Sequence, residues 1–428
     1  MSVLTVILML AAVMALAYLG FPIFIVFLLC SIGVMAGTGM PIVPGLQESF
    51  MGGAADFFQK FFLIFFFGSL LASILQHSGG AESIAKKILE VIGEKYVIIG
   101  IVIATAVLVY GGISVFVVMF AIVPMALPML KKGNIPRYLL PGILMAGLGT
   151  FAMTSPGTPQ IQNIIPMKYL DTPATAALGP GLITGLVIAI LVTAYMQWQK
   201  IRAKSKGESY TSSAFDEAAA SVEEGKLPHW LIGLLPLLVV VLLLNLFKLS
   251  PEVSLGLGVL AALALLFRNL GSMEKLFGAL NEGSKNAVLV IMSTSMAVGF
   301  GTTVADSAAY PVISDWVSNL GGNPLIASTL STTVLCGVTG SASGGLGIAA
   351  PIMADQFLGQ VNPESLHRIM SVASGGLDSL PHNGFVIAML SYLGLTHKES
   401  YKEIFVVSAI IPLICCFVFL IPLLMLWN

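Results

Sequence analysis

The stretch Leu377-Asp378-Ser379-Leu380-Pro381-His382-Asn383-Gly384-Phe385, here the second broken segment, interrupts an apolar run long enough to cross a bilayer. Its Pro and Gly disfavour a continuous helix. At bilayer depth, unsatisfied backbone is tolerated only where protein buries it or where it lines a wet cavity, and ionisable groups there are candidates for function. The stretch 153–163, Met-Thr-Ser-Pro-Gly-Thr-Pro-Gln-Ile-Gln-Asn, has the same character and is the first broken segment. The two predict a pair of interrupted membrane helices.

The composition is that of a membrane protein. The chain has 428 residues, of which 57% are hydrophobic and only 10% are charged, whereas soluble proteins carry roughly 25% charged residues. A net charge of −1 gives no basis for nucleic-acid binding. The first apolar run has neither a basic leader nor a cleavage site, so we expect a retained helix. All four cysteines lie in apolar runs, which predicts buried free thiols: Cys30, Cys336, Cys415 and Cys416.

Apolar runs of roughly 17–25 residues are needed to span a bilayer as helices. The sequence contains ten candidates, two of them interrupted by the broken segments. We therefore predict an all-α polytopic fold. The predicted spans are 3–20, 21–38, 58–76, 138–167 (interrupted), 175–196, 230–247, 252–267, 286–304, 367–396 (interrupted) and 404–426.

Two further apolar stretches, 97–130 and 324–358, are too long for one span. Small residues split each near its middle, at Tyr110-Gly-Gly-Ile-Ser114 and at Thr339-Gly-Ser-Ala-Ser-Gly-Gly345. Each stretch is either two full spans or a re-entrant hairpin whose tip lies inside the membrane. The small polar tips favour hairpins.

Charge placement predicts the topology. We take the polar stretch 197–228 as a cytoplasmic linker, because cytoplasmic loops are enriched in Lys and Arg. With two hairpins, both termini then lie outside. On this topology most of the 20 basic residues fall on the cytoplasmic side. Treating the two long stretches, 97–130 and 324–358, as double spans preserves much of this excess. The basic residues left outside are Lys60, Lys168, Lys248 and Arg368.

A weak internal repeat relates residues 1–196 to residues 229–428. Gly111 and Gly340 share one offset (340 − 111 = 229) with two pairs of serines, 78 with 307 and 114 with 343. On the predicted topology the two units are inverted, each with five crossings and one hairpin. Inverted repeats with broken helices that meet near the midplane are typical of secondary transporters.

Four motifs together resemble those of the gluconate permease (GntP) family, in its hydroxybutyrate-permease-like branch: Tyr110–Phe116, Gly157–Pro166, Ser379–Gly384 and Gly394–Tyr401. The similarity runs through nearly the whole chain. It implies uptake of small organic acid anions across the bacterial inner membrane, coupled to protons or another cation. The wider superfamily implies a homodimer in which a transport part moves as an elevator against a scaffold.

The predicted binding residues lie at the hairpin tips and in the broken segments. Helix N-termini and hydroxyl groups at the tips suit an anion, although small residues also serve helix packing. Hydroxyl and amide side chains in the broken segments either bind substrate or only form hydrogen bonds with the backbone groups that the prolines leave without a helical partner. The predicted set is Gly111, Gly112, Ser114, Thr154, Ser155, Gly157, Thr158, Gln160, Asn163, Ser341, Ser343, Ser379, His382 and Asn383.

Cation coupling is predicted at Asp378 and His382, four residues apart. An imidazole titrates near neutral pH and so can respond to protons. The alternative is a structural hydrogen bond between the two side chains. Asp306 is a further candidate for a cation site, although an acid capping a helix end at the membrane interface is the favoured explanation. His367 is expected at a membrane interface.

The resulting hypothesis is a proton- or cation-coupled symporter for a small anion such as 3-hydroxybutyrate, working by alternating access. A gluconate or sugar-acid symporter is the alternative, and an ion channel or an intramembrane enzyme would be a different class. No cofactor is expected beyond a proton or sodium as coupling ion, and no motif of an ATPase or a metalloprotease occurs. The expected partners are the organic anion, the bilayer and a second copy of the chain.

Overall fold

The computed structural model describes residues 2–213, 227–312, 315 and 322–427. Within these residues the chain is helical, and the β-structure is limited to one isolated bridge between Leu358 and Val361. Six helices are long and apolar enough to cross a membrane, by length and composition, and shorter apolar helices accompany them. The all-helical membrane fold predicted from composition is confirmed.

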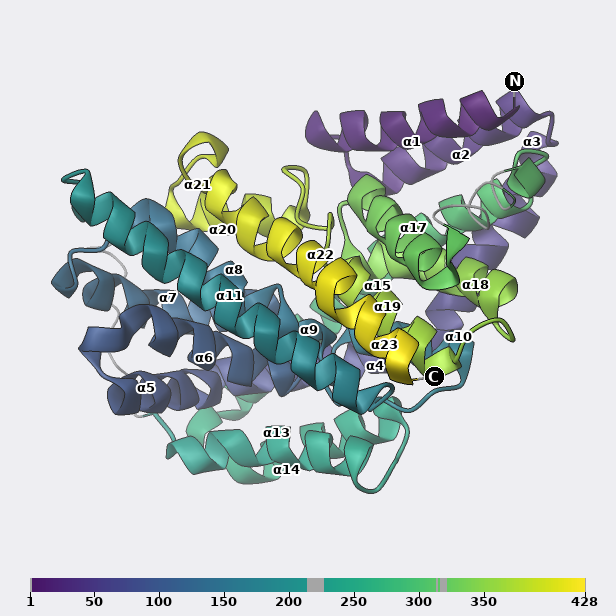
Figure 1. Ribbon diagram of the computed structural model, residues 1–428. Coiled ribbons are helices and arrows are strands. Elements are labelled where there is room, and N and C mark those ends of the chain that lie inside the picture. The colour runs from purple at the N-terminus through teal and green to yellow at the C-terminus, as the bar shows by residue number, and fades with distance from the viewer. Residues whose placement is uncertain (1, 214–226, 313–314, 316–321, 428) are drawn as a thin grey trace.

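The first half of the chain begins with an antiparallel helix pair and one long helix, followed by a hairpin and a broken helix (Figure 1). Its elements are α1 (Ser2–Tyr18), α2 (Ile23–Thr38), α3 (Ile42–Pro44), η1 (Gly45–Phe50), α4 (Met51–His77), α5 (Gly80–Ile92), η2 (Glu94–Tyr96), α6 (Val97–Tyr110), α7 (Val115–Lys132), η3 (Arg137–Leu139), α8 (Leu140–Leu148), α9 (Phe151–Thr154), α10 (Ile161–Leu170) and α11 (Leu178–Ser205).

The second half follows the same order of elements. Its elements are α13 (Trp230–Asn245), α14 (Pro251–Leu270), α15 (Met273–Ala305), α17 (Pro324–Thr339), α18 (Ala342–Phe357), α19 (Pro363–Ser374), α20 (Gly384–Leu393), α21 (His397–Phe405), η5 (Val406–Ile410), α22 (Ile411–Cys415), η6 (Cys416–Leu420) and α23 (Ile421–Trp427).

The element bounds agree with the offset of 229 found in the sequence. Shifted by that number, α1 covers 231–247 and α2 covers 252–267, close to α13 and α14. The hairpin α6–α7 corresponds to α17–α18 in the same way. Some helices are longer than the predicted spans. For example, α15 starts at Met273 and α11 continues to Ser205. The predicted linker 197–228 thus begins as helix, and its residues 214–226 lie outside the described residues.

The long helices α4 and α15 pack against each other along their length. Small residues allow this close approach, as is common between membrane helices. A Cβ on Gly299 would lie 2.4 Å from the Phe50 carbonyl oxygen, and one on Gly283 would lie 3.0 Å from the Leu70 Cα. On one face of the molecule, α11 and the α21–α23 helix run side by side (Figure 1).

Two buried arginines connect the halves, because each donates hydrogen bonds to backbone carbonyls of the other half. Arg137, in the first half, donates to the carbonyl of Leu393 at the end of α20. Arg368, in the second half, donates to the carbonyls of Thr154 and Ala176, at 2.6 and 2.9 Å, on either side of α10. We expected Arg368 at the outer end of a span, but it is fully enclosed by protein. The uncapped carbonyls of the broken helix provide the acceptors that make this burial possible.

His367 differs from expectation in the same way. It was predicted at a membrane interface, yet it is fully buried on α19. Its Nδ1 lies 2.7 Å from the Thr172 hydroxyl, and its Nε2 lies 3.0 Å from Oδ1 of Asn163. A broken helix needs such partners for its polar groups, and the neighbouring half of the molecule supplies them.

Candidate functional site

A cavity of about 520 Å³ lies where both hairpin tips and both broken segments meet. The long helices α4 and α15 form a further wall, which brings Ser69 and Ser293 to the cavity. The residues of the predicted site that line it are Gly112, Ser114, Gln160, Ser341, Ser343, Asp378, Ser379, His382 and Asn383.

Four helices begin at this cavity. For each of α7, α10, α18 and α20, both the N-cap residue and the first helical residue line it. The first N–H groups of a helix have no partner within the helix, and the helix dipole places partial positive charge there. Lys and Arg are absent from the cavity lining, so these helix ends supply its positive potential. The N-cap residues are Ser114, Gln160, Ser341 and Asn383.

The tip of the second hairpin is a cluster of hydroxyl groups. The Ser341 hydroxyl accepts a hydrogen bond from the Gly344 amide at 3.2 Å and lies 3.2 Å from the Ser343 hydroxyl. Thr294 on α15 extends the cluster, with its hydroxyl 3.3 Å from that of Ser343. These groups provide both donors and acceptors at the start of α18.

Gly340 shapes the same tip. Its φ of +59° ends α17 in the left-handed conformation that favours glycine. A Cβ at this position would lie 2.6 Å from the His382 ring, so the imidazole packs directly on the glycine backbone. The side-chain amide of Asn383 donates to the Gly340 carbonyl at 2.9 Å. The second broken segment is thereby docked on the second hairpin tip.

The first broken segment docks on the first hairpin tip in a related way. The Gln160 amide donates to the carbonyls of Val109 and Ile113, at 2.6 and 3.2 Å, and the Thr158 hydroxyl donates to the Tyr110 carbonyl at 3.3 Å. Each tip and its broken segment therefore form one hydrogen-bonded unit. The side-chain amide of Gln160 therefore already donates two hydrogen bonds within the protein.

Asp378 and His382 both face the cavity, but no hydrogen bond or ion pair joins them in the described chain. The alternative of a structural hydrogen bond between them is therefore not realised. Oδ1 of Asp378 and Nε2 of His382 are buried and have no partner in the described part of the protein. A buried polar atom without a partner carries a desolvation cost, and such atoms are common where a ligand or ion binds.

The back of the second broken segment is held by the helix α21. Tyr401 donates to the Ser379 carbonyl at 3.1 Å, and Nε2 of His397 lies 3.0 Å from the Pro381 carbonyl oxygen. The Ser379 hydroxyl lies 2.5 Å from that of Ser408. These contacts fix the backbone and leave the side chains of Asp378 and His382 directed elsewhere.

The remaining predicted residues lie away from the cavity. Gly111 packs against Leu237, Thr154 and Ser155 are buried at the start of the first broken segment, and Asp306 is exposed at the end of α15. Thr158 and Asn163 are fully buried, and Asn163 donates to the carbonyls of Thr158 and Ala174, both at 2.9 Å. Gly157, with a φ of +86°, donates its amide to the Ala174 carbonyl.

Sequence reasoning missed the contributions of α4 and α15. Ser69 and Ser293 sit in the apolar middle parts of long helices, and hydroxyl residues there give no signal that separates a cavity wall from ordinary packing. Phe385 and Phe116 also line the cavity, with their rings edge to face at 5.0 Å. This aromatic pair joins the start of α20 to the start of α7, one from each half.

Comparisons with known proteins agree with this architecture. Over 96% of both chains, the sequence is 33% identical to an uncharacterised transporter, YxjC, of Bacillus subtilis. It is 23% identical to a gluconate permease of Zymomonas mobilis, covering 89% of this chain and 88% of that one. The fold resembles that of MtrF from Neisseria gonorrhoeae, described as one of a class of antimetabolite efflux pumps.

That structural match has a TM-score of 0.56 and 13% sequence identity, and it covers 90% of this chain and 84% of MtrF. It concerns the fold alone. The family model of the GntP family permeases matches residues 1–426, nearly the entire sequence. The chain therefore belongs to the GntP family and is a membrane transporter.

Proposed function

We propose that the protein is a cation-coupled symporter that takes up a small organic acid anion such as 3-hydroxybutyrate or a related monocarboxylate. The observation that carries this proposal is the convergence of four helix N-termini on one cavity that contains no Lys or Arg. Free N–H groups at helix N-termini are suited to a carboxylate. The cavity of about 520 Å³ lies within the range of small-molecule sites, roughly 300–1,000 Å³.

The hydroxyl cluster at the second tip suits the hydroxyl group of such a substrate. Ser341 and Ser343 supply donors and acceptors next to the start of α18. The carboxylate is then held by backbone N–H groups, while the polar tip of the substrate exchanges hydrogen bonds with these serines. Helix ends carry only about half a unit charge each, so an anion is bound without a fixed ion pair.

Coupling is proposed at Asp378 and His382. Both face the cavity, and each has an unpartnered buried atom. Protonation of the imidazole adds positive charge beside the anion, which links substrate binding to a proton. Sodium is the alternative coupling ion, with the Asp378 carboxylate as an oxygen ligand.

Alternating access is proposed to follow from the two inverted repeats. The matched element order of the halves supports this proposal, with each hairpin tip bound to its own broken segment. In the elevator form of this mechanism, the hairpins and broken helices move as one body against α4 and α15. A homodimer in the bacterial inner membrane, with a cytoplasmic linker and both termini outside, completes the proposal.

A gluconate-type sugar acid is the second candidate substrate. It is favoured by the similarity to the gluconate permease of Zymomonas mobilis and by the hydroxyl-lined second tip. A longer polyol chain would reach Ser69 and Ser293 on the wall formed by α4 and α15.

Counterflow in proteoliposomes tests the proposal. Vesicles loaded with unlabelled 3-hydroxybutyrate should accumulate labelled 3-hydroxybutyrate transiently, with saturable kinetics, and a pH or sodium gradient should increase uptake. Gluconate loading in parallel separates the two candidates. Flux that does not saturate and shows no exchange would indicate a channel and would contradict the carrier mechanism.

A further inference from the structure

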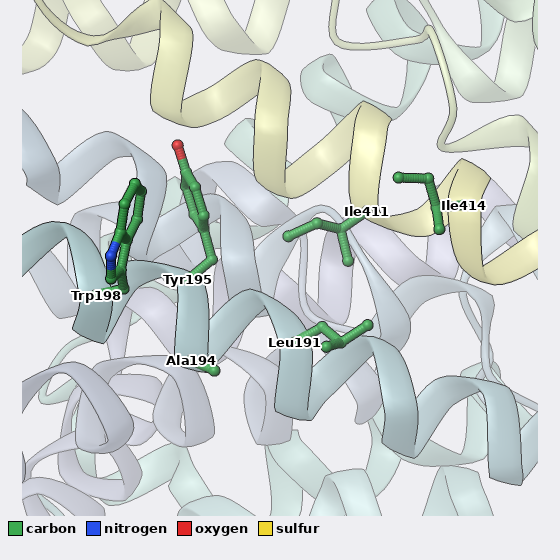
Figure 2. Close-up of a pocket in the computed structure, with 6 residues that line it drawn as sticks. All are labelled: Leu191, Ala194, Tyr195, Trp198, Ile411 and Ile414. Atoms are coloured by element: carbon green, nitrogen blue, oxygen red, sulfur yellow. The ribbon is translucent and has the colours of Figure 1, made fainter.

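An apolar groove of about 370 Å³ lies on the outer surface between α11 and α22. Figure 2 shows Leu191, Ala194, Tyr195 and Trp198 along α11, with Ile411 and Ile414 of α22 opposite them. Leu191, Trp198 and Ile414 are 40–52% exposed. In a membrane transporter, an exposed apolar surface of this kind contacts lipid or a second copy of the protein.

The α11 side of the groove continues into positive charge. Positions 191, 194, 195, 198 and 202 recur at helical spacing and so lie on one stripe of α11. The Arg202 guanidinium lies 5.3 Å from the centre of the Trp198 ring, which confirms that both side chains share this face. Lys206 follows one turn later. The stripe is thus apolar along the groove, aromatic at its end and basic beyond it.

This order matches the layers of one membrane leaflet. From Leu191 to Arg202 the helix rises about 16 Å at 1.5 Å per residue, close to half of a hydrocarbon core of roughly 30 Å. Tryptophan is enriched at the headgroup level. An acyl chain lying along the groove would therefore have its phosphate beside Arg202.

The local charge balance favours an anionic headgroup. Lys200, Arg202, Lys204 and Lys206 occupy the end of α11, and Lys402 is exposed on α21 nearby. Of the adjacent acids, Glu208 pairs with Lys206 at 3.8 Å, and Glu403 is buried, where its carboxylate accepts hydrogen bonds from Tyr195 and Gln199. These two bonds also fix α21 beside this part of α11. Basic residues near the membrane surface attract anionic lipid headgroups.

We propose that this groove is a binding site for an anionic phospholipid, with one acyl chain between α11 and α22 and the phosphate at Arg202 and Lys206. A second copy of the chain fits the groove less well. A two-fold dimer around an axis along the membrane normal would bring the two basic helix ends together, and like charges repel.

Native mass spectrometry of the detergent-purified protein tests the proposal with phosphatidylglycerol and phosphatidylcholine of identical acyl chains. Phosphatidylglycerol should bind at least about tenfold more tightly, since its net negative charge is attracted by the basic side chains and phosphatidylcholine carries no net charge. The double variant Arg202→Gln/Lys206→Gln should lose most of this preference. The control Lys131→Gln/Lys132→Gln removes the same charge at the end of α7 and should retain it.

A steric variant tests the apolar part independently. Ala194→Trp fills the groove and should weaken binding of phosphatidylglycerol severalfold with both basic residues in place. Leu186→Trp, on the same helix at a position 63% exposed and outside the groove, is its control. Equal loss in both basic variants, unchanged binding in Ala194→Trp, or a change of oligomeric mass in Ala194→Trp would each overturn the proposal.

Discussion

The two broken segments are built alike but held differently. In the first, side chains from elsewhere bind successive carbonyls: Arg368 binds Thr154, Tyr110 binds Pro156 and Asn245 binds Gly157. In the second, α21 holds two carbonyls from behind, and the unpartnered atoms of Asp378 and His382 face the cavity. The first segment carries no ionisable side chain at the cavity.

This difference suggests that the two broken segments have different roles. Hydrogen bonds to these three carbonyls make the first segment a rigid wall, because each unmet buried acceptor would cost about 1–3 kcal/mol. The second segment leaves one buried polar atom of each titratable side chain without a partner in the described chain, which is costly for stability and therefore indicates function. Substitutions in the first segment should thus affect folding, and substitutions in the second should affect transport.

The largest effect is expected from Arg368→Met. The substitution leaves the carbonyls of Thr154 and Ala176 buried without donors, which should cost roughly 3–5 kcal/mol of stability. Thermal unfolding in detergent should show a clear fall of the midpoint. The control Lys168→Gln breaks a partly exposed ion pair with Glu252, at 2.5 Å, and should cost at most about 1 kcal/mol. Similar midpoints for both variants would refute the rigid-wall account.

Asp378→Asn should impair transport without lowering stability, in contrast to Arg368→Met. The amide keeps the shape of the side chain but removes its charge, so folding should be unchanged. Uptake in proteoliposomes should fall at least about tenfold, equivalent to 1.4 kcal/mol. Ser155→Ala, at a buried position of the first segment away from the cavity, is the matched control and should retain uptake. Normal transport by Asp378→Asn would remove this residue from the coupling mechanism.

His382→Ala tests the response to pH. An imidazole loses its proton as the pH rises through the mildly acidic to neutral interval. Protonated His382 favours anion binding, so wild-type uptake should decrease across this interval at constant proton gradient. The variant should show a flat profile. A pH profile that survives the substitution would assign proton coupling to another group.

The smallest effect distinguishes the two hairpin tips. Ser341 caps α18 through the Gly344 amide, whereas the side chain of Ser114 makes no cap bond to α7. Ser341→Ala should therefore cost about 1 kcal/mol of stability and raise the KM about fivefold. Ser114→Ala should leave stability within about 0.5 kcal/mol of the wild type. Equal changes in melting temperature for the two variants would mean that helix capping does not distinguish the two hairpin tips.

Much of the architecture could be predicted from local sequence. Apolar runs, split by Gly-Gly and Gly-Ser tips and by Pro-containing stretches, predicted the helices and where they break, because helix length and helix breakers are local properties. The ends were less predictable: α15 begins thirteen residues before the predicted span (286 − 273), since its first turns are polar and carry no apolar signal. Ser272 instead caps this helix through the Lys275 amide.

The sequence by itself determined a helical membrane chain and two polar breaks, and it predicted an internal repeat. Only the tertiary structure decided which polar groups face the cavity. Gln160 lines it while Asn163, three residues later, is fully buried against His367. The charged Arg368 is enclosed because carbonyls of the other half lie within hydrogen-bonding distance. Such partners come from positions about 200 residues away, and a local pattern carries no information about distant packing.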